Sequence, residues 1–93
     1  MMTFVQRLAA SLKILRTNKK LTQEKFAELC NVDYNSYRKW ETGKNSPSAD
    51  NIDKICSANK IDIIDLLLLS NPIKADKQTI IDDITAKLHL LGR

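Results

Sequence analysis

The segment from residue 34 to residue 42 reads YNSYRKWET. At about 3.6 residues per helical turn, Tyr37 and Trp40 fall on one side, where we expect them to be buried anchors rather than stacking aromatics. The opposite side gathers the hydrogen-bonding side chains Tyr34, Asn35, Arg38, Lys39 and Thr42. Amide, guanidinium and ammonium groups bind the base edges and phosphates of nucleic acids. This side therefore predicts a contact with a polyanion, and a merely solvated polar face is the alternative.

The rest of the chain lacks the residues that catalysis or metal binding needs. His89 is the only histidine, and the two glycines, Gly43 and Gly92, lie far apart, so neither a catalytic triad nor a glycine-rich phosphate loop is present in the sequence. Cys30 and Cys56 form no CxxC pair, and we expect reduced thiols packed as small apolar side chains, with a disulfide or metal site as the alternatives. We expect no enzyme, no metal and no cofactor.

The net charge of +4 is unevenly distributed over the 93 residues. Residues 1–48 hold nine Lys or Arg against four acids, which gives +5, and residues 49–93 hold six against seven, which gives −1. The basic half fits a polyanion partner. The longest apolar run, residues 66–69, is far shorter than the roughly 20 residues of a membrane span, and the N-terminus does not resemble a signal peptide. We therefore expect a cytoplasmic protein with no membrane partner.

Helical spacing and a few helix-breaking residues divide the chain into six predicted helices. The first three cover residues 4–17, 23–30 and 34–42, the fourth runs to about residue 58, the fifth begins after residue 62, and the sixth covers residues 76–91. The expected N-caps are the small polar residues Thr22, Asp33, Ser48 and Asp62.

The second and third predicted helices are joined by a very short turn. In the second helix, Phe26, Leu29 and Cys30 are expected to point inward. Asn31 tolerates the left-handed conformation that such a turn needs, and Gly43 is the expected end of the third helix. Two short helices joined in this way predict a helix-turn-helix.

Residues 21–44, LTQEKFAELCNVDYNSYRKWETGK, resemble the DNA-binding core of the lambda-repressor-like (Cro/XRE-type) helix-turn-helix family. The resemblance extends over about residues 8–69 and departs from the family at Asn31, where glycine is usual, and at Leu29, where a charged residue is common. It implies an all-α fold: a five-helix lambda-repressor-like DNA-binding domain over residues 1–71, with the helix-turn-helix at about 22–42. Residues 72–93 add a C-terminal helix.

The resemblance also implies which residues contact DNA. It implies base reading by Tyr34, Asn35, Arg38 and Lys39, and contacts to the DNA backbone by Gln23, Ser36, Thr42, Lys44, Asn45 and Arg16. Asp33 is expected to cap its helix, with acceptance from a cytosine amino group as the minor alternative. The resemblance further pairs Arg16 with Glu41, as an ion pair that fixes the third helix to the first.

The C-terminal segment carries an apolar stripe at Ile80, Ile81, Ile84, Leu88 and Leu91. We expect this stripe to be buried by homodimerisation rather than by packing within one chain. The residues predicted to form the dimer contact are Leu68, Leu69, Ile81, Ile84, Leu88 and Leu91.

The sequence therefore predicts a transcriptional regulator that binds double-stranded DNA sequence-specifically, as a homodimeric repressor on a palindromic operator. The alternative is an antitoxin or other interaction protein whose C-terminal helix binds a protein partner such as a toxin.

Overall fold

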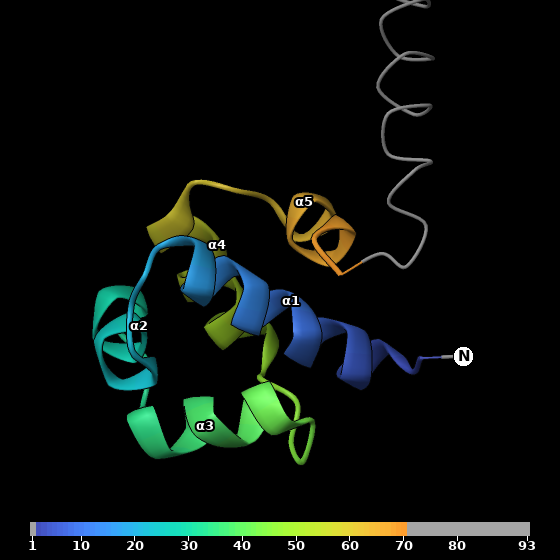
Figure 1. Cartoon of the computed structure of the whole chain (residues 1–93), viewed down its shortest axis with the longest axis horizontal. Coiled ribbons are helices and arrows are strands. Elements are labelled where there is room, and N and C mark those ends of the chain that lie inside the picture. The colour runs from blue at the N-terminus through green and yellow to red at the C-terminus, as the bar shows by residue number, and fades with distance from the viewer. Residues whose placement is uncertain (1, 71–93) are drawn as a thin grey trace, which may run out of the picture.

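The computed structural model describes residues 2–70, and these form five α-helices without a strand (Figure 1). The helices are α1 (Phe4–Asn18), α2 (Gln23–Cys30), α3 (Tyr34–Thr42), α4 (Ala49–Asn59) and α5 (Ile63–Leu68). The predicted all-α five-helix domain is confirmed. The predicted sixth helix, with Ile81, Ile84, Leu88 and Leu91, lies outside the described residues.

Each helix begins at a small polar residue whose side chain accepts a hydrogen bond from the backbone N–H three residues later. The predicted caps Thr22, Asp33, Ser48 and Asp62 all do so. Thr3 also caps α1, in a reciprocal arrangement in which the Gln6 side chain accepts from the Thr3 backbone N–H. These bonds satisfy N–H groups that a helix start leaves without an intrahelical partner. Local polar residues thus fix where each element begins.

Left-handed residues end three of the helices. Asn31 follows α2 at φ 57°, Gly43 follows α3 at φ 77°, and Lys60 follows α4 at φ 55°. A fourth left-handed residue, Lys20 at φ 58°, lies in the α1–α2 turn. The sequence predicts the roles of Asn31 and Gly43, whereas a lysine in this conformation is unexpected because its Cβ crowds the following carbonyl.

We predict that Lys60→Gly stabilises the fold by about 1 kcal/mol, because glycine adopts the left-handed conformation without the Cβ penalty. The measurement is the free energy of unfolding in urea. The matched control is Lys54→Gly inside α4, where the same substitution should destabilise the fold by about 1 kcal/mol. Equal signs for the two variants would contradict the prediction.

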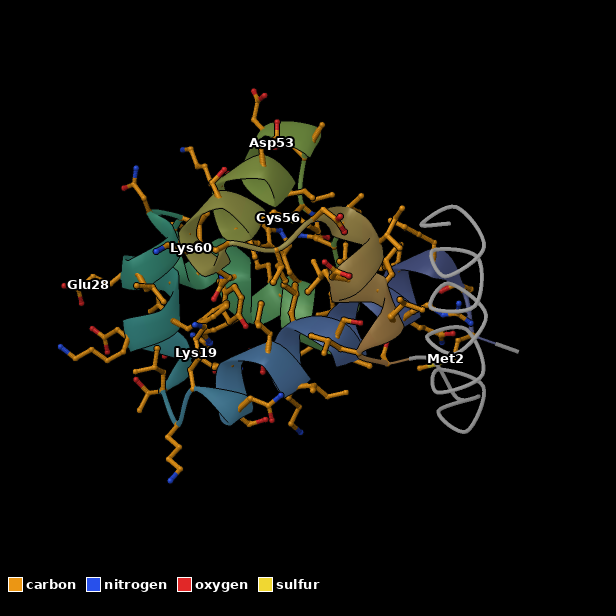
Figure 2. All side chains as sticks on the ribbon, turned by 90° about the horizontal axis from the view of Figure 1, so that it is seen from above. Met2, Lys19, Glu28, Asp53, Cys56 and Lys60 are labelled. Atoms are coloured by element: carbon orange, nitrogen blue, oxygen red, sulfur yellow. The ribbon has the colours of Figure 1, made fainter. Side chains whose placement is uncertain are left out.

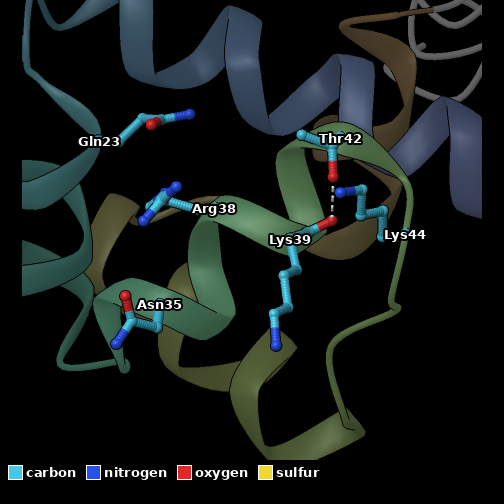
Figure 3. Close-up of a pocket in the computed structure, with 6 residues that line it drawn as sticks. All are labelled: Gln23, Asn35, Arg38, Lys39, Thr42 and Lys44. Atoms are coloured by element: carbon cyan, nitrogen blue, oxygen red, sulfur yellow. Dashed lines mark hydrogen bonds between the residues drawn. The ribbon is translucent and has the colours of Figure 1, made fainter.

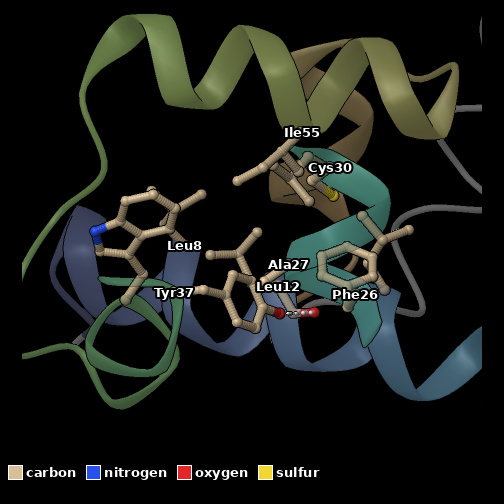
Figure 4. Close-up of a cluster of buried hydrophobic side chains, with 10 residues drawn as sticks. Leu8, Leu12, Phe26, Ala27, Cys30, Tyr37 and Ile55 are labelled. Atoms are coloured by element: carbon tan, nitrogen blue, oxygen red, sulfur yellow. Dashed lines mark hydrogen bonds between the residues drawn. The ribbon is translucent and has the colours of Figure 1, made fainter. Parts of the chain in front are cut away.

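The core lies between the helices and is closed by aromatic residues (Figure 4). Tyr37 and Phe26 are fully buried, with ring centroids 5.3 Å apart. Trp40 is 5% exposed and meets Tyr37 edge to face. The buried aliphatic residues Leu8, Leu12, Leu15, Ile55 and Leu66 complete the cluster. The prediction that Tyr37 and Trp40 are core anchors is confirmed, and one side of α3 is therefore packed against the interior.

Charged residues project away from this core, as Figure 2 shows for Glu28 on α2 and Asp53 on α4. Leu29 is also on the surface at 46% exposure, so the prediction that it points inward is wrong. Positions on a helix advance by about 100° each, and the buried sector of α2 is set by Phe26, Ala27 and Cys30. Leu29 lies beyond the edge of that sector.

Cys30 and Cys56 are both free thiols. Cys30 is buried in the core, and Cys56 is half-buried against it. Burial raises the pKa of both thiols because it disfavours the thiolate. The prediction that both cysteines pack as small apolar side chains is confirmed. Among residues 2–70 there is no cluster of His, Cys, Asp or Glu suited to a metal ion.

The packing of α1 against α3 and α5 makes it the central support, while α2 packs on α3 and α4 (Figure 1). Ser70, just after α5, is hydrogen-bonded to α1. Its Oγ donates to the Arg7 carbonyl at 2.8 Å and also lies 2.6 Å from the Oγ of buried Ser11. No helix within residues 2–70 is long and apolar enough to cross a membrane. Among the described residues, this arrangement leaves the outer side of α3 exposed.

Candidate nucleic-acid interface

An open groove of about 530 Å³ runs along the uncovered side of α3. Figure 3 shows the six side chains around it, which come from the start of α2, the exposed face of α3 and the loop that follows α3. They are Gln23, Asn35, Arg38, Lys39, Thr42 and Lys44. All six are hydrogen-bonding residues and three carry a positive charge, so the groove suits an anionic partner rich in acceptors.

Helix geometry gives α3 its two different sides. Tyr37 and Trp40 are three positions apart and point into the core. Asn35, Arg38 and Lys39, at complementary positions, are exposed. Because the buried aromatic side fixes the rotation of α3 about its axis, the polar side is presented in one orientation.

The basic side chains of the groove are available for an external anion. Within residues 2–70 the ion pairs are Arg16 with Glu41 and Lys25 with Glu28. Arg38, Lys39 and Lys44 take part in neither pair. The α2 N-terminus at Gln23 adds the positive end of a helix dipole to the same groove.

Asp33 is the acidic residue next to the start of α3, and its carboxylate faces its own helix. Oδ2 accepts from the Ser36 backbone N–H at 2.9 Å and from the Ser36 hydroxyl at 3.0 Å. These two bonds lower the pKa of Asp33. The predicted capping role is confirmed, and both of these bonds use Oδ2.

Arg16 and Glu41 join α1 to the end of α3. Arg16 Nε and Nη2 donate to the two Glu41 carboxylate oxygens at 2.8 and 2.9 Å, and Arg16 Nη1 donates to the Leu21 carbonyl at 2.9 Å. Gln23 Nε2 also donates to Glu41 Oε1, at 3.2 Å. The Glu41 carboxylate, at the end of α3, is therefore hydrogen-bonded to both α1 and the start of α2.

Burial makes this carboxylate dependent on its partners. The Glu41 side chain is 3% exposed and the Arg16 side chain 15%. Burial acts to raise the pKa of Glu41, but the hydrogen bonds from Arg16 and Gln23 and the positive charge of Arg16 outweigh it and leave that pKa lowered. The same pair keeps the pKa of Arg16 raised, chiefly through its hydrogen bond to Glu41. Glu41 is therefore ionised and compensated in the folded protein.

Two local contacts order the exposed side of α3. Arg38 Cζ lies 5.6 Å from the centroid of the Tyr34 ring. Thr42 Oγ1 donates to the Lys39 carbonyl at 2.9 Å, near the end of the helix (Figure 3). The first contact joins Arg38, which lines the groove, to Tyr34, which does not.

The structure brings most of the predicted site residues together, with some exceptions. Tyr34 and Asn45 are exposed beside the groove without lining it, while Ser36 and Arg16 are half-buried and bonded to Asp33 and Glu41. Leu68 and Leu69 are half-buried at the end of α5. The contact between Gln23 and Glu41 was not predicted, because nothing local in the sequence links positions 18 residues apart. The roles of these residues in binding stay predictions.

Comparison with known proteins places this geometry in a family. The helix-turn-helix family model matches residues 12–66, more than half of the chain, and no curated protein sequence matches. Two crystal structures of the clp gene regulator ClgR from Corynebacterium glutamicum have a similar fold. One is 23% identical with a TM-score of 0.66, over 74% of this chain and 88% of that chain. The other is 21% identical with a TM-score of 0.67, over 96% of this chain and 94% of that chain. The chain belongs to the lambda-repressor-like helix-turn-helix family of DNA-binding transcription regulators.

Proposed function

We propose that this regulator is a homodimeric repressor that inserts α3 into the major groove of a palindromic operator. The observation that carries the proposal is the groove of six hydrogen-bonding side chains without a carboxylate, along one side of a helix whose other side is locked into the core. A major groove accepts one α-helix and offers donors and acceptors that differ for each base pair. Two copies on one face of the duplex would place their α3 helices about 34 Å apart.

In this proposal the exposed side of α3 determines which bases are bound. Asn35 can pair through two hydrogen bonds with adenine, and Arg38 or Lys39 can donate to guanine. Tyr34 belongs to the same set through its place on the same exposed side. Each of these side chains is exposed at one of the first six positions of α3.

The residues around this set hold the DNA backbone. Gln23 offers a helix N-terminus to a phosphate, and Lys44 extends a positive charge from the loop after α3. The remaining members of the predicted backbone set are Ser36, Thr42, Asn45 and Arg16. Backbone contacts fix the orientation of α3 without selecting a sequence.

Lys44→Ala is expected to weaken binding to all double-stranded DNA to a similar degree and to reduce the slope of log K against log salt by about one unit, because one phosphate contact is lost. The measurement is binding to the selected site and to random duplex over a series of salt concentrations. The control is Lys54→Ala, an exposed lysine on α4 outside the groove, which should leave the slope unchanged. A loss confined to the selected site would assign Lys44 to base reading instead.

The dimer part of the proposal rests on apolar residues at the end of α5 and beyond. Leu68 and Leu69 are half-buried there, and Ile64 is 66% exposed on the same helix. The predicted partners Ile81, Ile84, Leu88 and Leu91 lie outside the described residues. Light scattering at several concentrations tests this part: a stable dimer supports it, whereas a monomer supports the alternative of an antitoxin that binds a different protein.

The test of the whole proposal is selection of bound sequences from a random pool of double-stranded DNA. Enrichment of an inverted repeat with half-sites one helical turn apart is the expected result. A protein that enriches no sequence would contradict operator binding. Repression is tested separately, by placing the enriched sequence over a reporter promoter, where the chain should lower transcription.

A further inference from the structure

The aromatic ring of Tyr34 lies beside the guanidinium of Arg38 on the exposed side of α3. Arg38 Cζ is 5.6 Å from the ring centroid, within the roughly 6 Å over which a guanidinium is attracted to a ring face. The two residues are four positions apart on one helix, so their side chains are neighbours by geometry. The guanidinium therefore already has an aromatic support in the protein without DNA.

The surroundings leave the donor groups of Arg38 free. Neither ion pair within residues 2–70 includes this residue. The carboxylate nearest to Tyr34 in sequence, Asp33, directs Oδ2 to the backbone N–H and hydroxyl of Ser36. A ring face takes up no N–H donor of a stacked guanidinium, so its planar fork remains able to bind a guanine edge.

Tyr34 and Arg38 also differ in their relation to the groove. Arg38 lines it, whereas Tyr34 is not among the six lining residues although it is 38% exposed. A long arginine side chain loses rotamer freedom when a base fixes it. A ring that already restricts the guanidinium reduces this loss, which favours binding without a further contact to DNA.

We propose that Tyr34 acts on base preference as a positioning residue, through the contact of its ring with Arg38, and that this role replaces the direct base contact that the resemblance implies for it. The inference deepens the proposed function and rests on it, because it requires α3 to bind in the major groove. In this arrangement Arg38 binds the acceptor edge of a guanine, to which a planar guanidinium donates two hydrogen bonds.

Two variants test the ring and the hydroxyl separately. Tyr34→Phe keeps the aromatic ring and removes the hydroxyl, whereas Tyr34→Leu keeps an apolar side chain and removes the ring. On the selected site, Tyr34→Leu should weaken binding about fivefold, the equivalent of one exposed cation–π contact, and Tyr34→Phe should stay within about twofold of the parent. In an Arg38→Ala background, Tyr34→Leu should cause no further loss. In a random pool, Tyr34→Leu and Arg38→Ala should relax preference at the same base pair.

A measurement without DNA reports the contact itself. The Arg38 Nε–H resonance should be shifted upfield by the ring current of residue 34 in the parent and in Tyr34→Phe, and should return to its ordinary position in Tyr34→Leu. Thermal unfolding of the three proteins should agree closely, because position 34 is on the surface. An unshifted parent resonance would overturn the inference.

The outcomes distinguish this inference from the proposed function. A parent protein that enriches no double-stranded sequence overturns both. A parent that binds its site, with losses from Tyr34→Leu and Arg38→Ala that simply add or that map to different base pairs, overturns the inference alone. Equal losses from Tyr34→Phe and Tyr34→Leu would assign the effect to the hydroxyl and also overturn it.

Discussion

Glu41→Ala is expected to lower the free energy of unfolding by about 3 kcal/mol, the low end of the range for breaking a buried ion pair. The low end applies because the Arg16 side chain keeps 15% exposure and therefore some hydration, while Glu41 is 3% exposed. The substitution leaves two Arg16 donors without an acceptor and frees the Gln23 amide. Denaturant unfolding monitored by the fluorescence of buried Trp40 measures the loss.

The same variant should bind double-stranded DNA about tenfold more weakly, a change of about 1.4 kcal/mol, because α3 loses its fixed position against α1 and α2. The matched control is Glu28→Ala, which removes an exposed pair with Lys25 whose side chains are 68% and 74% exposed. That change should cost less than about 1 kcal/mol. Unchanged unfolding and unchanged binding in Glu41→Ala would together contradict the role assigned to the pair.

Acidification should reproduce part of this loss. The pKa of Glu41 in the folded protein lies below its ordinary value of 4.5, so its contribution to stability is complete above pH about 4.5 and decreases as the pH falls through the folded pKa. Glu41→Gln, which keeps the size of the side chain, should lower stability near neutral pH and flatten this acid dependence. An unchanged acid dependence would assign it to another carboxyl group.

Asn35→Ala is expected to weaken binding to the selected operator by about 1–3 kcal/mol and to leave binding to random duplex nearly unchanged, because a side chain that pairs with adenine discriminates among bases. Alanine favours a helix more than asparagine does, so the fold itself should not be weakened. Competition binding with the two kinds of duplex measures the ratio.

The matched control is Asn45→Ala in the loop after α3, because it makes the same substitution at another exposed position. As a predicted backbone contact, Asn45 should contribute equally to both duplexes. Equal losses on both duplexes for Asn35→Ala would reassign Asn35 to the backbone. A smaller loss on the operator for Asn35 than for Asn45 would exchange their proposed roles.

Local chemistry explains why the helix starts could be predicted. The caps Thr22, Asp33, Ser48 and Asp62 act on N–H groups three residues away, so short sequence windows contain both partners. The two sides of α3 follow in the same way from the spacing of Tyr37 and Trp40.

Features that depend on packing or on backbone strain were not predictable. Lys20 and Lys60 adopt left-handed conformations, and no local rule favours lysine there. Leu29 was predicted to be buried because it is apolar, but the rotation of α2 is set by Phe26 and Cys30, and no element within residues 2–70 covers the adjacent side. Within the candidate site, the bond between Gln23 and Glu41 depends on how α2 meets α3, which only the assembled fold specifies. The Tyr34–Arg38 contact, by contrast, has a local signal in its spacing of four residues.

The enclosure of the Arg16–Glu41 pair has a consequence for how the protein responds to ionic strength. Mobile ions screen exposed charges over about 8–10 Å at physiological salt, but they reach a pair inside the protein far less. Contacts between Arg38, Lys39 or Lys44 and phosphates would therefore weaken steeply as salt rises, while the bonds that join α1, α2 and α3 persist. Added salt should release the protein from DNA with its binding surface still assembled, so that lowering the salt restores binding without any refolding step.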